Sequence, residues 1–229
     1  MRVVHVEHPD GRGPGVFGEG AEVVRWRAFE DPPPTGPVDA IVLYGASTNI
    51  VDAPDWLAVE MGWLRERLET GTPVLGVCFG AQVLAHALGA EVARAREPEI
   101  GWLPVTLTAA GRADPVLGAL PERFLACQWH SWACAVPEGG IALAESPVCL
   151  QAFHAGSAWG VQFHPEVDDE TLSTWIDTYR NDPDAVRLGF DPALAHAARE
   201  QNLPRWNELG RRLFRAFLRA APRATTRRS

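Results

Sequence analysis

The sequence predicts an α/β fold: a doubly wound, mostly parallel open sheet with extra β segments and a helical C-terminal extension. Short apolar, β-branched runs alternate with helical patterns through the first half of the chain. Short extended segments between glycine and proline turns follow, and the pattern from Asp168 onward is mostly helical. We therefore expect one α/β domain over residues 1–180 and a helical extension over residues 181–229, which ends in an arginine-rich tail.

The first half contains four predicted strands, each a short run of apolar and mostly β-branched residues. Between the third and the fourth strand, apolar side chains recur at helical spacing, namely Leu57, Met61, Leu64 and Leu68. A strand, a helix and a strand in succession imply a parallel pair of strands. The strands are expected at residues 3–6, 23–26, 40–43 and 74–77, and the helix at residues 56–68, closed by a turn at residues 70–73.

The second half contains a further helix and then five extended segments. The buried face of this helix is formed by Val83, Leu84, Ala87 and Leu88, and Gly89 ends it. The extended segments look like additional strands, either at the edge of the sheet or in a small second sheet. They lie near residues 103–107, 124–127, 141–144, 148–153 and 158–163. The last helix carries an apolar stripe that is typical of core packing, formed by Trp206, Leu209, Leu213 and Phe217.

The composition excludes several classes of function. The chain has 229 residues with 29 acidic and 21 basic side chains, and every basic side chain is an arginine. Without lysine it can form neither a Walker-type phosphate loop nor a lysine Schiff base. Residues 211–229 hold seven of the arginines and no acid, so the body is acidic. This argues against nucleic acid as the main partner. The arginine tail could still contact nucleic acid or an acidic protein surface, or be a solvated end.

The compartment and the state of the cysteines are predicted together. No run is long enough to cross a membrane, and residues 1–6 are too short and too polar for a signal peptide. We therefore expect a cytoplasmic protein. The cysteines form no CxxC pair and show no metal-like spacing; they are Cys78, Cys127, Cys134 and Cys149. In a reducing compartment these are expected to be free thiols, with no metal and no cofactor bound.

The segment GVCFGAQ, at residues 76–82, places Cys78 between a buried strand and the start of a helix. Glycines on both sides leave room for a tight turn that projects the side chain away from the backbone. Unpaired N–H groups and the helix dipole at this position favour a thiolate over a thiol. These features indicate a nucleophile. The alternative is a buried structural cysteine, and a base elsewhere in the chain decides between the two.

The segment GVQFHPE, at residues 160–166, supplies that base. A strand delivers His164 at its end, and Pro165 stops the ladder so that His164 and Glu166 can leave the sheet on one side. In an open parallel sheet, ligands gather at the carboxyl ends of the strands, where Cys78 also emerges. We therefore expect His164 to take the thiol proton and Glu166 to orient the ring and stabilise the imidazolium. Alone, His164 could equally be a hydrogen-bonded histidine with no catalytic role.

These two segments together resemble the signature of the class I glutamine amidotransferases, whose triad is Cys-His-Glu. The similarity covers most of residues 38–167, and the segments EIGW (99–102) and QWHS (128–131) resemble a stand-alone branch related to the amidotransferase domain of GMP synthetase. The resemblance implies a flavodoxin-like fold, with the amidotransferase domain at residues 1–180. It also implies a reaction in which Cys78 attacks the side-chain amide of glutamine, ammonia leaves, and water hydrolyses a γ-glutamyl thioester.

The resemblance further implies an oxyanion hole and a glutamine subsite. The backbone N–H groups of Gly45 and Phe79 match the two oxyanion donors. Gln82, Ser131 and His130 match positions near the bound glutamine; the alternatives for Gln82 and Ser131 are a polar group on a helix surface and a serine in a turn.

The sequence departs from the family's pattern at two positions. Ala46 stands where a second glycine is usual, which brings a Cβ atom into a tight loop whose geometry depends on whether φ is positive there. Trp132 stands where relatives commonly carry a small acid, so substrate preference is expected to differ.

Three functions remain open at this point. The first is a glutaminase that releases ammonia for a separate synthetase, since the chain has no nucleotide-binding signature with which to use the ammonia. The second is a self-sufficient hydrolase of another γ-glutamyl amide, which the residues at positions 46 and 132 keep open. The third is a catalytically silent binding or regulatory protein, against which the three retained triad residues argue.

Overall fold

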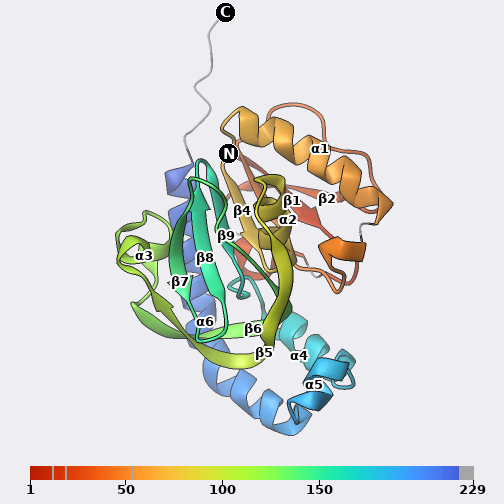
Figure 1. Ribbon diagram of the computed structural model, residues 1–229, viewed down its shortest axis with the longest axis vertical. Helices are drawn as coiled ribbons and strands as arrows, with labels where there is room; N and C mark the ends of the chain where they lie inside the picture. Colours follow the sequence, from red (N-terminus) through yellow and green to blue (C-terminus); the bar gives the residue numbers. More distant parts are fainter. Residues whose placement is uncertain (12, 19, 53, 222–229) are drawn as a thin grey trace, which may run out of the picture.

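The computed structural model describes residues 1–11, 13–18, 20–52 and 54–221. This part of the chain forms one nine-stranded sheet in the order β2-β1-β3-β4-β9-β8-β7-β5-β6 (Figure 1). The first five strands in this order run parallel, and each later strand pairs antiparallel with its neighbour. The strands are β1 (Arg2–Glu7), β2 (Glu22–Arg27), β3 (Ala40–Leu43), β4 (Val74–Val77), β5 (Val92–Leu107), β6 (Arg123–Cys134), β7 (Ile141–Glu145), β8 (Leu150–Ala155) and β9 (Ala158–Val161).

The four strands predicted in the first half are confirmed to within one residue at each end, as β1 to β4. The five later segments all join this same sheet, so there is no separate second sheet in the described residues. β9 lies inside the sheet, parallel to β4. β5 and β6 are longer than the segments expected from the sequence. Exposed residues such as Arg94 and Arg96 interrupt the apolar pattern there, because one side of this antiparallel pair faces water.

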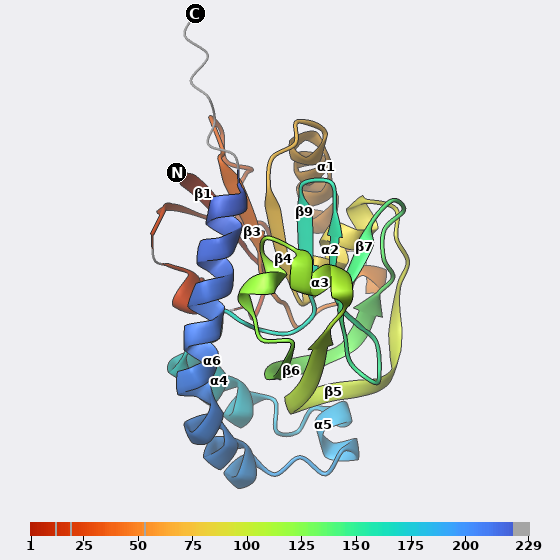
Figure 2. The ribbon, with the colours of Figure 1, turned by 90° about the vertical axis from the view of Figure 1, so that its left-hand side faces the viewer.

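Helices cover both faces of the sheet. On one face, α1 (Asp55–Glu69) and α2 (Phe79–Ala87) pack on side chains such as Val4 and Ile41. On the other face lies α6 (Pro192–Ala220), which packs on residues such as Val3 and Val42 (Figure 2). The smaller helices are α3 (Ala109–Ala113), α4 (Asp169–Thr178) and α5 (Pro183–Arg187), with short 3₁₀ helices η1 (Gly15–Gly18), η2 (Ile50–Asp52) and η3 (Leu117–Ala119).

The long helix α6 is part of the core. Its expected apolar stripe is buried, at Trp206, Leu209, Leu213 and Phe217. The indole N–H of Trp206 donates to the carbonyl oxygen of His164 at 2.7 Å. A Cβ atom at Gly210 would lie 2.0 Å from the carbonyl oxygen of Pro165, so only glycine lets the helix approach this closely. The helical extension therefore presses against the segment that carries His164.

Two further expectations concern the arginine-rich tail and membrane-spanning segments. Residues 222–229 of the arginine-rich tail lie outside the described residues. Within the described part of the chain, no helix is both long enough and apolar enough to cross a bilayer.

Candidate active site

Cys78 lies at the sharp turn between β4 and α2. Its backbone has φ 52° and ψ −113°, a conformation that L-residues rarely adopt and that is retained mainly at functional positions. Both flanking glycines are required for this turn. A Cβ at Gly76 would lie 2.6 Å from the carbonyl oxygen of Gly80, and a Cβ at Gly80 would lie 2.3 Å from that of Leu43. The expected strand-to-helix elbow is therefore present.

His164 and Glu166 follow the end of β9. The Nδ1 atom of His164 lies 2.8 Å from Oε1 of Glu166, and both side chains are almost fully buried. The backbone N–H of His164 donates to the carbonyl oxygen of Cys127 on β6, and the ring packs edge-on against Trp175 of α4. The imidazole is thus fixed by the carboxylate, by a strand and by an aromatic ring.

Gly45, which follows β3 and Tyr44, shows that Cys78 and His164 lie close together. A Cβ atom at Gly45 would lie 3.0 Å from Cε1 of His164 and 3.7 Å from Cβ of Cys78. Burial lowers the pKa of His164, but the charge of Glu166, and then that of Cys78, outweigh it and raise the pKa to about 10. The structure therefore brings the three expected triad residues together, and the raised pKa favours the protonated form of the ring.

The other cysteines have surroundings of a different kind. Burial raises the pKa of Cys127 far above its ordinary value and raises the pKa of Cys134 and of Cys149 to about 12. Because the thiolate is the nucleophilic form, these three residues are inert at neutral pH. All four cysteines are free thiols, as expected.

The two expected oxyanion donors flank Cys78. Phe79 is the first residue of α2, where the backbone N–H groups have no intrahelical acceptor. Gly45 is buried and lines the same cleft. Among the described residues, only Asp10 and Cys78 combine a side chain with a positive φ. Ala46 therefore adopts an ordinary backbone conformation, and its Cβ atom puts no strain on the loop.

A cleft of about 260 Å³ opens over Cys78. Sequence reasoning named Phe79 and Trp132 in its wall but not the roles of its other aromatic and charged residues. The aromatic part consists of Phe79, Trp129, Trp132, Trp175 and Tyr179, and the charged part includes Asp10, Arg94, Asp182 and Asp184. Arg94 donates to Asp184 at 2.6 Å, which joins β5 to α5 across the rim. Residues so far apart in the chain leave no local signal of their pairing.

The three expected substrate-binding side chains all have partners within the protein. Gln82 donates to the carbonyl oxygen of Trp132 at 3.1 Å and to the side chain of Gln162 at 3.2 Å. Ser131 donates to Asp184 at 2.5 Å, and this bond, with the charge of Arg94, lowers the pKa of that carboxyl group. Gln82, Ser131 and His130 all line the cleft, and their contact with substrate stays a prediction.

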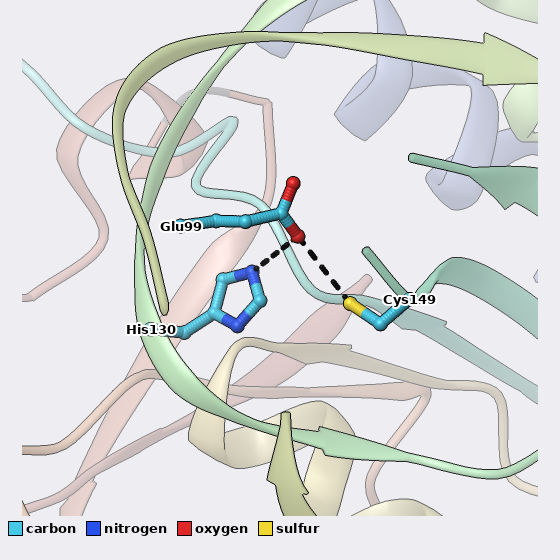
Figure 3. A group of neighbouring side chains, drawn as sticks. All are labelled: Glu99, His130 and Cys149. Carbon is cyan, nitrogen blue, oxygen red and sulfur yellow. Dashed lines mark hydrogen bonds and ion pairs between the residues drawn. The ribbon is translucent and has the colours of Figure 1, made fainter. Parts of the chain in front are cut away.

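His130 points instead toward Glu99 and Cys149 (Figure 3). Its Nε2 atom lies 3.3 Å from Oε2 of Glu99, and its Nδ1 atom lies 3.0 Å from the carbonyl oxygen of Trp132. Glutamate, histidine and cysteine can together bind a metal ion, a grouping that the spacing in the sequence did not reveal. The same Oε2 atom, however, also receives hydrogen bonds from Cys149, Ser146 and Gln151, at 3.4, 3.1 and 2.7 Å. These donors satisfy the buried carboxylate without a cation.

Comparison with known proteins places this geometry in a family. The model of the class-I glutamine amidotransferase family matches residues 19–176. A glutamine amidotransferase-like protein of Salmonella typhimurium is 27% identical over 191 residues, which cover 77% of this chain and 80% of that protein. The crystal structure of a glutamine amidotransferase from Thermotoga maritima superposes with a TM-score of 0.84 at 26% identity and covers 95% of this chain and 98% of that one.

Two further relatives have more specific names. One component of the glutamine-hydrolysing GMP synthase of Thermoplasma volcanium is 35% identical over 136 residues, covering 57% of this chain and 64% of that component. A gamma-glutamyl-L-1-hydroxyisopropylamide hydrolase from a Pseudomonas species is 30% identical over 152 residues, covering 62% of this chain and 50% of the hydrolase. The matched region thus spans less than two thirds of either relative. The family model matches most of this chain, and the fold agrees with it. The chain belongs to the class-I glutamine amidotransferase family.

Proposed function

We propose that the protein hydrolyses a γ-glutamyl amide through a thioester on Cys78. The thiolate attacks the γ-carbonyl carbon, and the oxygen becomes an oxyanion that accepts hydrogen bonds from the N–H groups of Gly45 and Phe79. His164 gives its proton to the leaving nitrogen, and ammonia or an amine departs. Water then gives a proton to His164 and attacks the thioester, which releases glutamate and restores the thiolate and the imidazolium.

One observation carries this proposal: the buried imidazole of His164 is held by Glu166 at 2.8 Å and lies beside Cys78, next to Gly45. A nucleophile, a base and an orienting carboxylate in this order make up a catalytic triad. The strained backbone of Cys78 argues against a silent binding or regulatory protein, because such strain is costly to keep without a function.

Glutamine is the first candidate substrate, with its ammonia passed to a separate synthetase. The family membership supports glutamine, and the similarity to a component of a GMP synthase supports a partner that uses the ammonia. The sequence itself carries no nucleotide-binding signature with which the chain could use that ammonia.

A γ-glutamyl amide with a larger amine is the second candidate. Five aromatic side chains line the cleft, with Trp132 at the position where relatives commonly carry a small acid, and apolar walls suit an alkyl or aryl amine better than ammonia. The similarity to a γ-glutamyl-hydroxyisopropylamide hydrolase supports the same candidate. This second enzyme would need no partner.

The deciding experiment is a panel of γ-glutamyl amides incubated with the purified protein. Glutamine, γ-glutamyl-isopropylamide and γ-glutamyl-p-nitroanilide are compared by release of ammonia or amine, with Cys78→Ala as the control. Cleavage of glutamine alone selects the first candidate, and a preference for the larger amides selects the second. If none is cleaved faster than by Cys78→Ala, the proposed function is wrong.

A further inference from the structure

A buried pair of side chains, His8 and Glu60, lies behind the loop that carries Gly45 and takes no part in the mechanism above. His8 follows β1 and Glu60 lies on α1, and their side chains have no exposed surface. The Nε2 atom of His8 lies 3.0 and 2.9 Å from the two carboxylate oxygens of Glu60. Its Nδ1 atom lies 2.9 Å from the carbonyl oxygen of Tyr44.

These contacts determine the direction of the hydrogen bond to Tyr44. A carbonyl oxygen can only accept, so Nδ1 of His8 carries a hydrogen and donates it. Nε2 faces both oxygens of Glu60, so a second hydrogen lies between the ring and the carboxyl group. Glu60 therefore fixes the ring so that Nδ1 points at Tyr44.

The carbonyl group of Tyr44 belongs to the same peptide unit as the N–H of Gly45. A trans peptide is planar, and its C=O and N–H point in opposite directions. Holding the Tyr44 oxygen toward His8 thus turns the Gly45 N–H the other way. The carbonyl group of Gly45 also packs closely against the backbone of Gly11. A Cβ atom at Gly11 would lie only 2.5 Å from the oxygen of Gly45.

The same imidazole also touches the second half of the proposed oxyanion hole. The ring of His8 packs edge-on against Phe79, with 5.0 Å between ring centroids and 81° between planes. Trp56 of α1 packs on the ring as well, at 5.5 Å. One buried side chain therefore contacts the Tyr44–Gly45 peptide unit, which carries one of the two N–H groups, and the ring of Phe79, the residue that carries the other.

We propose that His8 and Glu60 are positioning residues that orient the Tyr44–Gly45 peptide so that its N–H points into the cleft. This inference rests on the proposed function, in which that N–H stabilises the oxyanion. Replacing a buried pair of this kind by apolar residues of similar size is often neutral for stability, so a role in orientation gives a reason for burying the pair here.

Two double variants test this proposal. His8→Leu/Glu60→Leu removes both polar side chains, including the donor to Tyr44, so neither is left buried without its partner. His8→Asn/Glu60→Gln keeps a side-chain N–H near the place of Nδ1. Leu64→Ala is the matched control, because it opens a cavity in the same helix at a buried residue outside the pair.

The kinetic prediction separates orientation from folding. We expect the leucine pair to lower kcat for the cleaved γ-glutamyl amide about 10²-fold, the usual effect of losing one oxyanion donor, with KM little changed. The Asn/Gln pair restores most of this loss. Leu64→Ala lowers the melting temperature without lowering kcat. Alkylation of Cys78 by iodoacetamide, which forms no oxyanion, keeps its rate in all three variants.

A spectroscopic arm tests the peptide directly and does not depend on activity. Tyr44 and Tyr179 are the two tyrosines of the chain, and only Tyr44 is followed by glycine. Labelling with ¹³C-carbonyl tyrosine and ¹⁵N-glycine therefore leaves a single carbonyl-to-amide correlation, that of Tyr44–Gly45. We expect this signal to shift in the leucine pair and to stay near the wild-type position in the Asn/Gln pair and in Leu64→Ala.

The outcomes are distinct. An unmoved signal in the leucine pair overturns the proposal, as does a wild-type kcat in that variant. If the wild-type protein cleaves no γ-glutamyl amide, the proposed function fails, and the signal still decides whether His8 and Glu60 orient the peptide.

Discussion

His164 and Glu166 are joined by one hydrogen bond, from Nδ1 to Oε1 at 2.8 Å, while the other carboxylate oxygen, Oε2, is buried with no hydrogen-bond partner in the described residues. A buried carboxylate oxygen without a donor is costly, and a nearby imidazolium offsets part of that cost. The carboxylate of Glu166 and the proton of His164 therefore stabilise each other, and the charge state of the site depends on both.

The first prediction concerns pH and stability. The pKa of His164 is raised from 6.5 to about 10 in the folded protein. Below pH 6.5 the ring is protonated in both states, and its contribution to the free energy of unfolding is fully present. As pH rises toward 10, the unfolded chain loses this proton first, so the contribution declines. Denaturant unfolding should show this decline in the wild type and a weaker one in Glu166→Gln. Equal slopes in the two proteins would contradict the assignment.

The second prediction ranks the triad variants. Cys78→Ala and His164→Ala should each abolish hydrolysis while the fold is retained, because the residues of a triad act as a unit. Glu166→Gln should be milder, since it misorients the base but leaves one in place. Steady-state amine release by the three purified variants, with circular dichroism as the folding control, measures the order. A normal rate in Cys78→Ala would show that another residue is the nucleophile.

The third prediction uses the strained backbone of Cys78. Cys78→Gly and Cys78→Ala both remove the thiol and should both be inactive. Glycine adopts a φ of 52° freely, whereas alanine pays roughly 1–2 kcal/mol for a left-handed conformation. We therefore expect the glycine variant to be more stable than the alanine variant by about 1 kcal/mol in denaturant unfolding. The reverse order would mean that the elbow is not strained in solution.

The fourth prediction concerns the contact between Gly45 and His164. A methyl group at position 45 would lie 3.0 Å from Cε1 of the ring, so Gly45→Ala should displace the imidazole and lower kcat. Gly62→Ala is the control, since nothing lies within 4 Å of its Cβ position on α1. That variant should gain roughly 1 kcal/mol of stability from helix propensity and keep its activity. Unchanged kcat in Gly45→Ala would exclude tight packing at this point.

The fifth prediction separates the two candidate enzymes. If the protein supplies ammonia to a synthetase, the isolated chain should react with a thiol-directed glutamine analogue yet release ammonia slowly, and its partner should raise kcat more than it lowers KM. If it is a self-sufficient hydrolase, steady-state turnover of the isolated chain should reach the order of the roughly 10 s⁻¹ median for enzymes. The hydrogen bond from His8 to the carbonyl oxygen of Tyr44, and a φ at Ala46 that is not positive, favour rapid turnover without a partner.

The parallel half of the fold could be predicted because its signals are local. The runs at residues 40–43 and 74–77 coincide with β3 and β4, since strands buried on both faces are continuous apolar runs. The lengths of β5 and β6 could not be predicted. Polar residues such as Arg94 lie on the water-facing side of an antiparallel pair, and their pattern does not differ from that of a loop.

In the candidate site, too, residues with a local signal could be predicted and residues paired across the fold could not. Cys78 and His164 could be found because each follows the carboxyl end of a strand, where ligands gather, and glycine or proline marks the turn. His8 also follows a strand, but its partner Glu60 is 52 positions away, on a helix with no motif. Arg94 and Asp184 are 90 positions apart. Pairings of this kind are produced by the tertiary fold, and a local pattern does not contain them.

The position of α6 in the chain has a consequence for a molecule still being translated. Trp206 and Gly210 lie against the carbonyl oxygens of His164 and Pro165, so α6 supports the segment that carries the proposed base. A ribosome makes the elbow of Cys78 long before it reaches α6. A nascent chain therefore carries the proposed nucleophile before the proposed base is held in place. We expect hydrolysis to begin only after α6 has left the exit tunnel, and a message that stops before codon 206 should yield a protein with the whole triad and no turnover.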